Sequence, residues 1–158
     1  MTAPDDVPFR LVIHGGAGAI NRSRLTAERE AVYRQALTQS LNAGYAVLSG
    51  GGSCIDAVIA AIVVMEDSPL FNAGKGSVFN HEGQNELEAS IMEGATRLAG
   101  AVAGITTVRN PIRAAHAIMM KSPHAMLIGH GAETFAAEQG LEIVDPDYFH
   151  TPHRWEQL

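Results

Sequence analysis

Residues 68–80 read SPLFNAGKGSVFN, a stretch that holds one proline, two glycines and two asparagines in thirteen positions. These residue types favour turns, because proline fixes one backbone angle while glycine and asparagine tolerate conformations that other residues avoid. A phosphate-binding P-loop is excluded, since it needs Gly-x-x-x-x-Gly-Lys followed directly by Ser or Thr. Here Lys75 precedes Gly76, and Pro69 stands where the first glycine belongs. The stretch is therefore a turn-rich loop with a role other than nucleotide binding.

Two helices are expected before this loop. Thr26 can cap the first helix, and three consecutive glycines at 50–52 end it. Ser53 and Asp56 form the Ser-x-x-Asp variant of a capping box and begin a second helix, which is apolar almost all round and should be buried. Pro69 marks the end of that helix. The predicted apolar stripe of the first helix comprises Val32, Ala36, Leu41, Tyr45 and Leu48.

The remaining sequence alternates between strand and helix patterns, which predicts layered helices and sheets in one unit. Residues 9–14 (FRLVIH) are expected to form a buried strand that runs into a glycine-rich turn. Residues 85–94 (NELEASIMEG) alternate apolar and polar side chains, and residues 98–108 (LAGAVAGITTV) predict an adjacent strand with both faces buried. Three further elements follow: a helix over 110–122 with Asn110 as its cap, a short strand over 125–129 and a helix over 131–140.

Composition limits the class of protein. The 158 residues suit a single domain, and 46% hydrophobic with 18% charged residues is typical of a soluble globular protein. A net charge of −6 without a basic stripe disfavours a nucleic-acid or anionic-membrane partner. The longest apolar run, 57–65, is far shorter than the roughly 18 residues of a membrane span. The acidic start lacks the apolar segment of a secretory signal, and the single Cys54 fits a reducing cytoplasm and a packed core thiol.

Two polar motifs suggest catalysis without completing a site. The sequence VIHGGAG at 12–18 resembles the oxyanion loop of lipase-like hydrolases, but the Gly-x-Ser-x-Gly motif that such enzymes require is absent from the sequence. Glu86 and Glu88 share one face of a predicted strand, so they are either an acid/base pair or, more commonly, part of a solvated face.

A third group has the spacing of metal ligands. His150 and His153 form a His-x-x-His pair with Asp145 and Asp147 nearby. Short histidine pairs of this kind are more often surface residues than ligands. Spacing alone therefore leaves no complete catalytic constellation.

Several uncommon strings occur together and in a fixed order. With them the chain resembles the plant-type L-asparaginase and isoaspartyl-peptidase family over nearly its whole length. The strings are IHGGAGAI (13–20), SCIDAVIAAIVVMEDSPLFNAGKGSVF (53–79), NELEASIMEG (85–94), AGAVAGITTVRNP (99–111) and SPHAMLIGHGAETFA (122–136).

The resemblance implies an N-terminal nucleophile hydrolase, an α+β protein with an αββα four-layer sandwich. Such a protein is made as a precursor that cuts itself, so that a threonine within Gly-Thr-Val-Gly becomes the first residue of a second chain. That motif is absent here, and Thr106 and Thr107 lie in an apolar strand that suits burial. Residues 1–158 thus resemble the α subunit of a single domain, completed by a separate β subunit. The threonine needs no His or Asp partner, because its own α-amino group, with a pKa near ~8, accepts the hydroxyl proton.

The resemblance also implies a role for the loop. In the family, the residues leading into and through PLFNAGKG wrap a structural sodium ion with backbone carbonyl oxygens, which are ligands that hard cations prefer. Lys75 departs from the apolar residue expected at its position, although a carbonyl ligand depends little on its side chain. The carbonyls carried over are those of Met65, Glu66, Ser68, Phe71, Ala73 and Lys75.

The active site implied by the resemblance lies next to this loop. Asn72 would point toward the nucleophilic threonine, and His14, Gly15 and Gly16 would line the floor of the site. Glu88 and Glu93 stand where the family commonly has aspartate, which leaves their local hydrogen bonds open.

The implied reaction is the hydrolysis of L-asparagine to L-aspartate and ammonia, and of β-aspartyl (isoaspartyl) dipeptides. A glycosylasparaginase-like amidase and a non-catalytic binding module of the same fold are the alternatives. The expected partners are a β subunit from the same precursor, a second αβ heterodimer and a small amide or dipeptide substrate, with no nucleic acid and no membrane. Sodium is expected as a structural ion, no cofactor is expected for catalysis, and the expected location is cytoplasmic.

Overall fold

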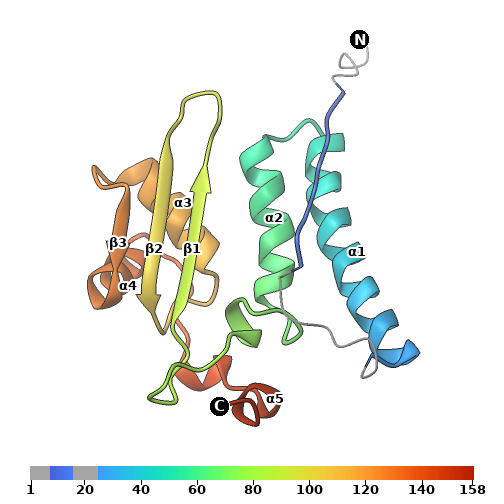
Figure 1. The fold of residues 1–158 in the computed structure, drawn as a ribbon. Coiled ribbons are helices and arrows are strands. Elements are labelled where there is room, and N and C mark those ends of the chain that lie inside the picture. The colour runs from blue at the N-terminus through green and yellow to red at the C-terminus, as the bar shows by residue number, and fades with distance from the viewer. Residues whose placement is uncertain (1–7, 16–24) are drawn as a thin grey trace. The chain divides into compact units, whose positions relative to one another are not determined.

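The computed structural model describes residues 8–15 and 25–158, and these divide into two compact units with a boundary between Met65 and Glu66. Each unit is described by itself. The first contains two helices and an extended segment, and the second contains a three-stranded sheet with its helices (Figure 1). This mixed α and β content agrees with the expected class. Within the described residues, no helix is both long and apolar enough to cross a membrane.

The first helix, α1 (Ala27–Ser49), begins as predicted, since the Thr26 side chain accepts a hydrogen bond from the Arg29 backbone N–H. Its predicted apolar stripe is wrong in part, because Val32, Leu41 and Tyr45 are exposed. The buried face of α1 consists instead of Ala36, Ser40 and Gly44.

Small residues form that face because other segments of the same chain, around Leu11 and Ala57, come very close to it. A Cβ at Gly44 would lie 2.7 Å from Leu11 Cδ2 and 2.8 Å from the Ala57 carbonyl oxygen. Ser40 donates its hydroxyl to the Ala61 carbonyl oxygen at 2.7 Å, so its buried polar atom is satisfied. Close approach, rather than large apolar side chains, therefore joins α1 to α2.

The second helix, α2 (Cys54–Glu66), starts where the capping signal predicts. The Asp56 backbone N–H donates to Ser53 Oγ at 3.0 Å, and the Ser53 hydroxyl donates to the Asp56 carboxylate at 2.7 Å. The expectation of a packed core thiol is wrong, because Cys54 is exposed. Cys54 is the first residue of the helix, where the chain has only just left the exposed turn at 50–53.

The predicted strand at 9–14 is not found as a strand, and the segment is not part of the sheet. The alternation of its side chains is nevertheless present. Phe9, Leu11 and Ile13 are partly buried, whereas Val12 on the opposite side is 89% exposed. The Phe9 ring lies 5.4 Å from the Tyr45 ring of α1. The segment is thus extended and packed on one side, but it lacks the ladder of hydrogen bonds that defines a strand.

The second unit is built on a sheet with the order β1-β2-β3. Strand β1 (Leu87–Met92) pairs antiparallel with β2 (Ala99–Ile105), as the sequence predicts, and β2 pairs parallel with β3 (Met126–Ile128). The register shifts between Leu87 and Ala89, and Gly104 on the facing strand has a φ of 60°. A glycine with positive φ accommodates the extra residue of such a bulge.

Helices cover one face of this sheet. Helix α3 (Pro111–Lys121) packs against β1 and β2, and α4 (Gly129–Glu138) packs against β2 and β3 (Figure 1). The predicted helix is found, with Pro111 in its first turn and with Ile112, Ala115, Ile118 and Met119 buried on its inner face. Three short helical turns complete the unit: η2 (Gly74–Gly76), η3 (Pro146–Phe149) and α5 (Pro152–Trp155).

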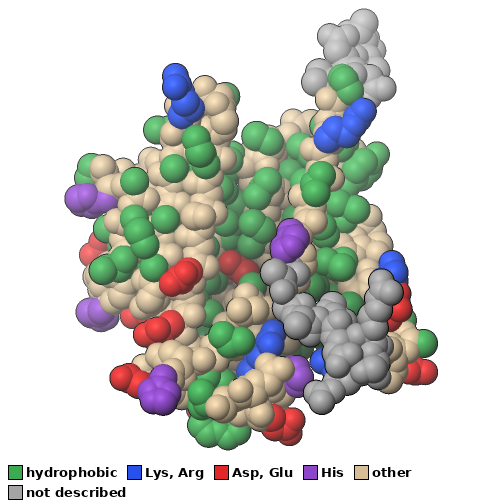
Figure 2. All heavy atoms as spheres, viewed as in Figure 1, with side chains coloured by type: hydrophobic (Ala, Val, Ile, Leu, Met, Phe, Trp, Pro, Cys, Tyr) green, Lys and Arg blue, Asp and Glu red, His purple; other side chains and the backbone are tan. Residues whose placement is uncertain are grey.

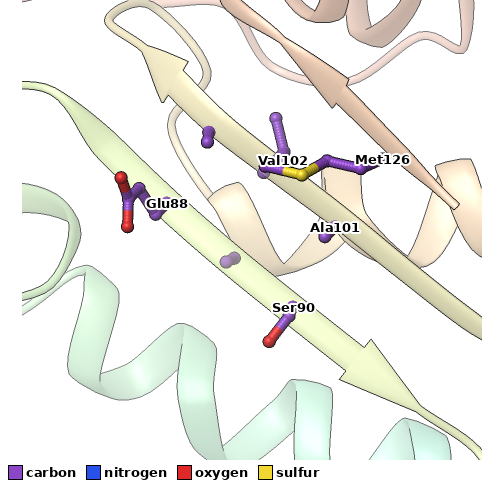
Figure 3. A pocket seen from close by; sticks show the side chains of 7 residues that line it. Glu88, Ser90, Ala101, Val102 and Met126 are labelled. Carbon is purple, nitrogen blue, oxygen red and sulfur yellow. The ribbon is translucent and has the colours of Figure 1, made fainter.

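The other face of the sheet is not covered by any element of residues 66–158. The sequence predicted that β2 is buried on both faces, but within this unit it is covered on one face only. Met92, Met126 and Ile128 are exposed, and hydrophobic side chains lie at the surface over the strands (Figure 2). An open hollow of about 350 Å³ lies on this face, and Glu88 and Met126 are among its lining residues (Figure 3). The small side chains of β2, chiefly Ala101 and Ala103, leave this hollow unfilled.

Candidate functional site

The loop from Glu66 to Gly76 turns back sharply on itself, and two glycines make this possible. Gly74 has a φ of 49°, and a Cβ at this position would collide with the Glu66 carbonyl oxygen. A Cβ at Gly76 would likewise collide with the carbonyl oxygen of Phe71. Neither position has room for a methyl group, and at Gly74 the positive φ is a second obstacle, because L-residues avoid it. The loop therefore brings its own carbonyl oxygens close to its later backbone.

The six carbonyls named from the sequence fall on three parts of this segment. Met65 and Glu66 are the last two residues of α2, Ser68 and Phe71 lie in the loop, and Ala73 and Lys75 lie at η2. The Ala73 carbonyl already accepts a hydrogen bond from Gly76 N–H at 3.1 Å, which leaves its second lone pair. The role of the six carbonyls as ligands of a cation stays a prediction, for which backbone carbonyl oxygens are chemically suitable donors.

The sequence also offered a candidate metal site built from side chains, at His150 and His153. Within residues 8–15 and 25–158, no group of three or more His, Cys, Asp or Glu side chains is arranged to hold a metal ion. The His150 and His153 candidate is therefore wrong. His150 instead packs its ring against Phe79, with centroids 5.2 Å apart, and His153 is exposed on α5.

Asn72 lies at the exposed side of the loop, where its side chain makes one defined contact. Its Oδ1 accepts a hydrogen bond from the Val78 backbone N–H at 2.9 Å. This bond spans six residues and closes the loop around η2. The amide nitrogen Nδ2 has no hydrogen bond to any of the described residues, so it keeps two N–H donors available. Asn72 is thus both a turn residue and a potential donor.

Asp67 is the centre of a network that the sequence did not predict. Its carboxylate accepts from Arg109 Nε at 3.2 Å, from Asn110 Nδ2 at 3.2 Å and from the Tyr148 hydroxyl at 3.4 Å. Arg109 also binds the Glu142 carboxylate at 3.0 Å. Asp67, which directly follows α2, is therefore tied to the start of α3 and to η3.

Tyr148 connects this network to the other end of the loop. The Lys75 ammonium lies 5.0 Å from the centre of the Tyr148 ring, on which Arg109 also lies at 5.5 Å. Burial, followed by the negative charge of Asp67, raises the pKa of the Tyr148 hydroxyl, which keeps it protonated as a donor. Lys75, which stands where an apolar residue was expected, thus contacts Tyr148 near the end of the loop. The hydroxyl of the same tyrosine binds Asp67 near the start of the loop.

The side chain of Glu66 is buried, with only 3% of its surface exposed. Its Oε1 accepts from the Ile112 backbone N–H at 2.9 Å, in the first turn of α3, while Oε2 has no partner among the described residues. Burial is the largest influence and raises the pKa of this carboxyl from 4.5 to about 7, against the lowering effect of the Ile112 hydrogen bond. Glu66 is therefore a buried acid that caps the first turn of α3.

A pH dependence of stability follows from this burial. A carboxyl whose pKa is raised by folding stabilises the folded state below pH 4.5, and that contribution is lost as pH rises through about 7. We expect the loss to be about 3 kcal/mol. Glu66→Gln keeps an acceptor for Ile112 but cannot ionise. The thermal midpoint of the native protein should therefore fall relative to that of the variant between pH 4.5 and 7.5, whereas parallel profiles would contradict the prediction.

The other acidic candidates have structural roles. Glu86 and Glu88 are both exposed, as expected for a solvated face. Glu93 accepts the Thr96 hydroxyl at 2.5 Å in the turn between β1 and β2, so its longer side chain is accommodated. Thr106 is partly buried, and its backbone N–H and hydroxyl both donate to the Glu133 carboxylate, which supports the expectation that it is not a nucleophile.

The predicted floor of the site falls in the first unit. His14 and Gly15 are exposed residues of the extended segment, and Gly16 lies outside the described residues. Their role at an active site therefore stays a prediction.

Comparison with known proteins decides the family. A family model described as "Asparaginase" matches residues 7–158, which is nearly the whole chain. The chain belongs to the asparaginase family.

Curated relatives of this asparaginase-family chain come from distant organisms. It is 48% identical over 148 residues to the isoaspartyl peptidase of Salmonella typhimurium, covering 94% of this chain and 47% of the relative. It is 43% identical over 139 residues to the isoaspartyl peptidase/L-asparaginase of Mus musculus (88% and 41%). It is 42% identical over 148 residues to the plant-type L-asparaginase of Pyrococcus abyssi (94% and 47%). The chain spans less than half the length of these relatives.

Proposed function

We propose that this chain is the α subunit of an amidohydrolase that converts L-asparagine to L-aspartate and ammonia and splits β-aspartyl dipeptides. The observation that carries the proposal is the family match over residues 7–158, together with relatives named for both activities. The nucleophile would be the N-terminal threonine of a β subunit, released when the precursor cuts itself. Gly-Thr-Val-Gly does not occur within residues 1–158.

The reaction would proceed through a covalent ester. The threonine Oγ attacks the amide carbon of the substrate and passes its proton to the threonine's own α-amino group. That proton then goes to the leaving nitrogen, so ammonia or an amine departs and a β-aspartyl ester remains. Water hydrolyses the ester and restores the threonine. The Asn72 amide would donate a hydrogen bond that orients the threonine, which fits its available Nδ2.

A sodium ion would serve as a structural part of the loop. The carbonyl oxygens of Glu66, Ser68, Phe71, Ala73 and Lys75, with that of Met65, would hold it, and the close return of the loop at Gly74 and Gly76 is compatible with this set. The ion would supply positive charge inside a ring of carbonyl dipoles. Asn72 lies between two of the proposed carbonyl ligands, so the ion would also fix its backbone.

The assembly would be an αββα sandwich completed by the β subunit, in a dimer of αβ heterodimers located in the cytoplasm. The open face of the sheet supports this arrangement, because it would gain neighbours from a second chain.

The test compares residues 1–158 with the whole protein. We expect no asparagine-dependent ammonia release from residues 1–158 alone and poor solubility, whereas the whole protein should release ammonia and hydrolyse β-aspartyl dipeptides. Activity of the isolated chain would overturn the two-chain mechanism. Activity of the whole protein on glycosylated asparagine alone would favour a glycosylasparaginase, and inactivity on every amide would favour a binding module.

A further inference from the structure

The last helical turn of the chain is attached to the loop through one arginine. Helix α5 is capped by Thr151, whose hydroxyl accepts from the Arg154 backbone N–H at 3.4 Å. From this turn, Arg154 Nε donates to the Gly76 carbonyl oxygen at 2.7 Å in a partly buried position. Its Nη1 donates outward to Gln157 at 2.9 Å. The contact to Gly76 joins residues 78 positions apart in the sequence.

An aromatic cluster anchors α5 in this position. The Trp155 ring meets Phe79 edge to face at 5.3 Å and lies 5.5 Å from His150. The same tryptophan would be in ordinary van der Waals contact, at 3.5 Å, with a Cβ at Gly83. Arg154 therefore projects from a turn that packs against Phe79 and His150 through Trp155, and its hydrogen bond to Gly76 links this turn to the loop.

The constrained segment is the one that holds Asn72. Gly76 and Val78 are separated by a single residue. The Val78 backbone N–H donates the hydrogen bond that Asn72 Oδ1 accepts. Arg154 fixes the carbonyl of Gly76 and thereby sets where the Val78 N–H lies. The position of the Asn72 amide then depends on two hydrogen bonds in series, at 2.7 Å and 2.9 Å.

We propose that Arg154 is a positioning residue that holds Gly76–Val78 in place and, through Val78, aims the Asn72 amide at the reacting group. The inference rests on the proposed function of Asn72. A charged donor suits this task, because a hydrogen bond from a guanidinium to a partly buried carbonyl is stronger than one between neutral groups. Loss of the bond leaves the Gly76 carbonyl unpaired and lets the segment shift, and a misplacement of about 1 Å can reduce a rate by about 100-fold.

The experiment is a double-mutant cycle in the whole protein, with Arg154→Met and Asn72→Ala. Arg154→Met should lower kcat on a β-aspartyl dipeptide by about 10- to 100-fold, with KM changed by less than about threefold. In the Asn72→Ala background, Arg154→Met should have no further effect, because the group it positions is gone. Gln157→Leu removes the other partner of Arg154 and should leave kcat unchanged. Arg154→Lys should recover part of the loss, since it retains a charged donor.

The outcomes separate this inference from the proposed function. Native kcat in Arg154→Met, or effects that multiply in the double variant, would overturn the role of Arg154. An inactive native protein would overturn the proposed function itself, and native kcat in Asn72→Ala would overturn the role of Asn72 on which this inference rests. If Arg154→Met does not fold, the cycle uses Arg154→Lys, whose ammonium reaches beyond the position of Nε and should lower kcat about threefold. An unchanged kcat in that variant would count against the proposal.

Discussion

Turnover should fall by about 10- to 1,000-fold when Asn72 is replaced by alanine in the whole protein, with the fold and the cation retained. The side chain closes the loop through the Val78 N–H and keeps its Nδ2 donors available for the proposed nucleophile. Alanine removes both functions. The measurements are kcat on a β-aspartyl dipeptide and intact mass, since the mass separates failed self-cleavage from failed hydrolysis.

Asn72→Asp separates the turn from the chemistry. Aspartate keeps the oxygen that accepts from Val78 N–H at 2.9 Å, but it exchanges the amide donor for a negatively charged oxygen. That charge would raise the pKa of the threonine α-amino group and oppose its release as a free base. We therefore expect turnover as low as in the alanine variant, with a nearly native thermal midpoint. Native turnover in a fully cleaved Asn72→Asp protein would reduce Asn72 to a turn residue.

Asn80 provides a matched control for these variants. Its Oδ1 accepts from the backbone N–H groups of Glu82 and Gln84 at 2.9 and 3.0 Å, so it closes a neighbouring turn in the same way. No chemical role is assigned to it. Asn80→Asp should therefore leave turnover unchanged, and a comparable loss there would attribute the effect of Asn72 to loop structure.

Gly74→Ala should destabilise the protein by about 2–5 kcal/mol. Two costs combine at this position, because an L-residue at a φ of 49° is strained by about 1–2 kcal/mol and the added Cβ meets the Glu66 carbonyl, which costs about 1–3 kcal/mol more. The same collision would push apart the carbonyls proposed to bind sodium. Thermal unfolding in sodium and in choline chloride measures both effects, and we expect the variant to lose any stabilisation by sodium.

Gly51→Ala is the control for the strain alone. Gly51 also has a positive φ, 81°, but no atom lies within 4 Å of a Cβ built there. Its replacement should therefore cost only about 1–2 kcal/mol and leave the sodium response unchanged. Equal destabilisation by the two variants would mean that the close return of the loop at Gly74 contributes nothing.

The sequence by itself determined the elements whose signals are local. Thr26 and Ser53 cap helices through residues three positions away, and Pro111 begins α3 because its fixed φ suits a first turn. The alternation along β1 predicted which side chains of that strand are buried. The loop sequence, together with four other strings, also carried the resemblance to the family that the family match confirms.

Only the tertiary structure decided which distant groups meet. Tyr148 binds Asp67 across 81 positions and Arg154 binds Gly76 across 78, and no periodicity in the sequence encodes either contact. The buried face of α1 was misjudged for the same reason. Hydrophobicity predicted that Val32 and Tyr45 are buried. In the structure Ser40 and Gly44 are buried instead, because other segments of the same chain approach α1 closely there. Local patterns report what a segment can form, but burial, pKa shifts and long-range hydrogen bonds depend on the neighbours that folding supplies.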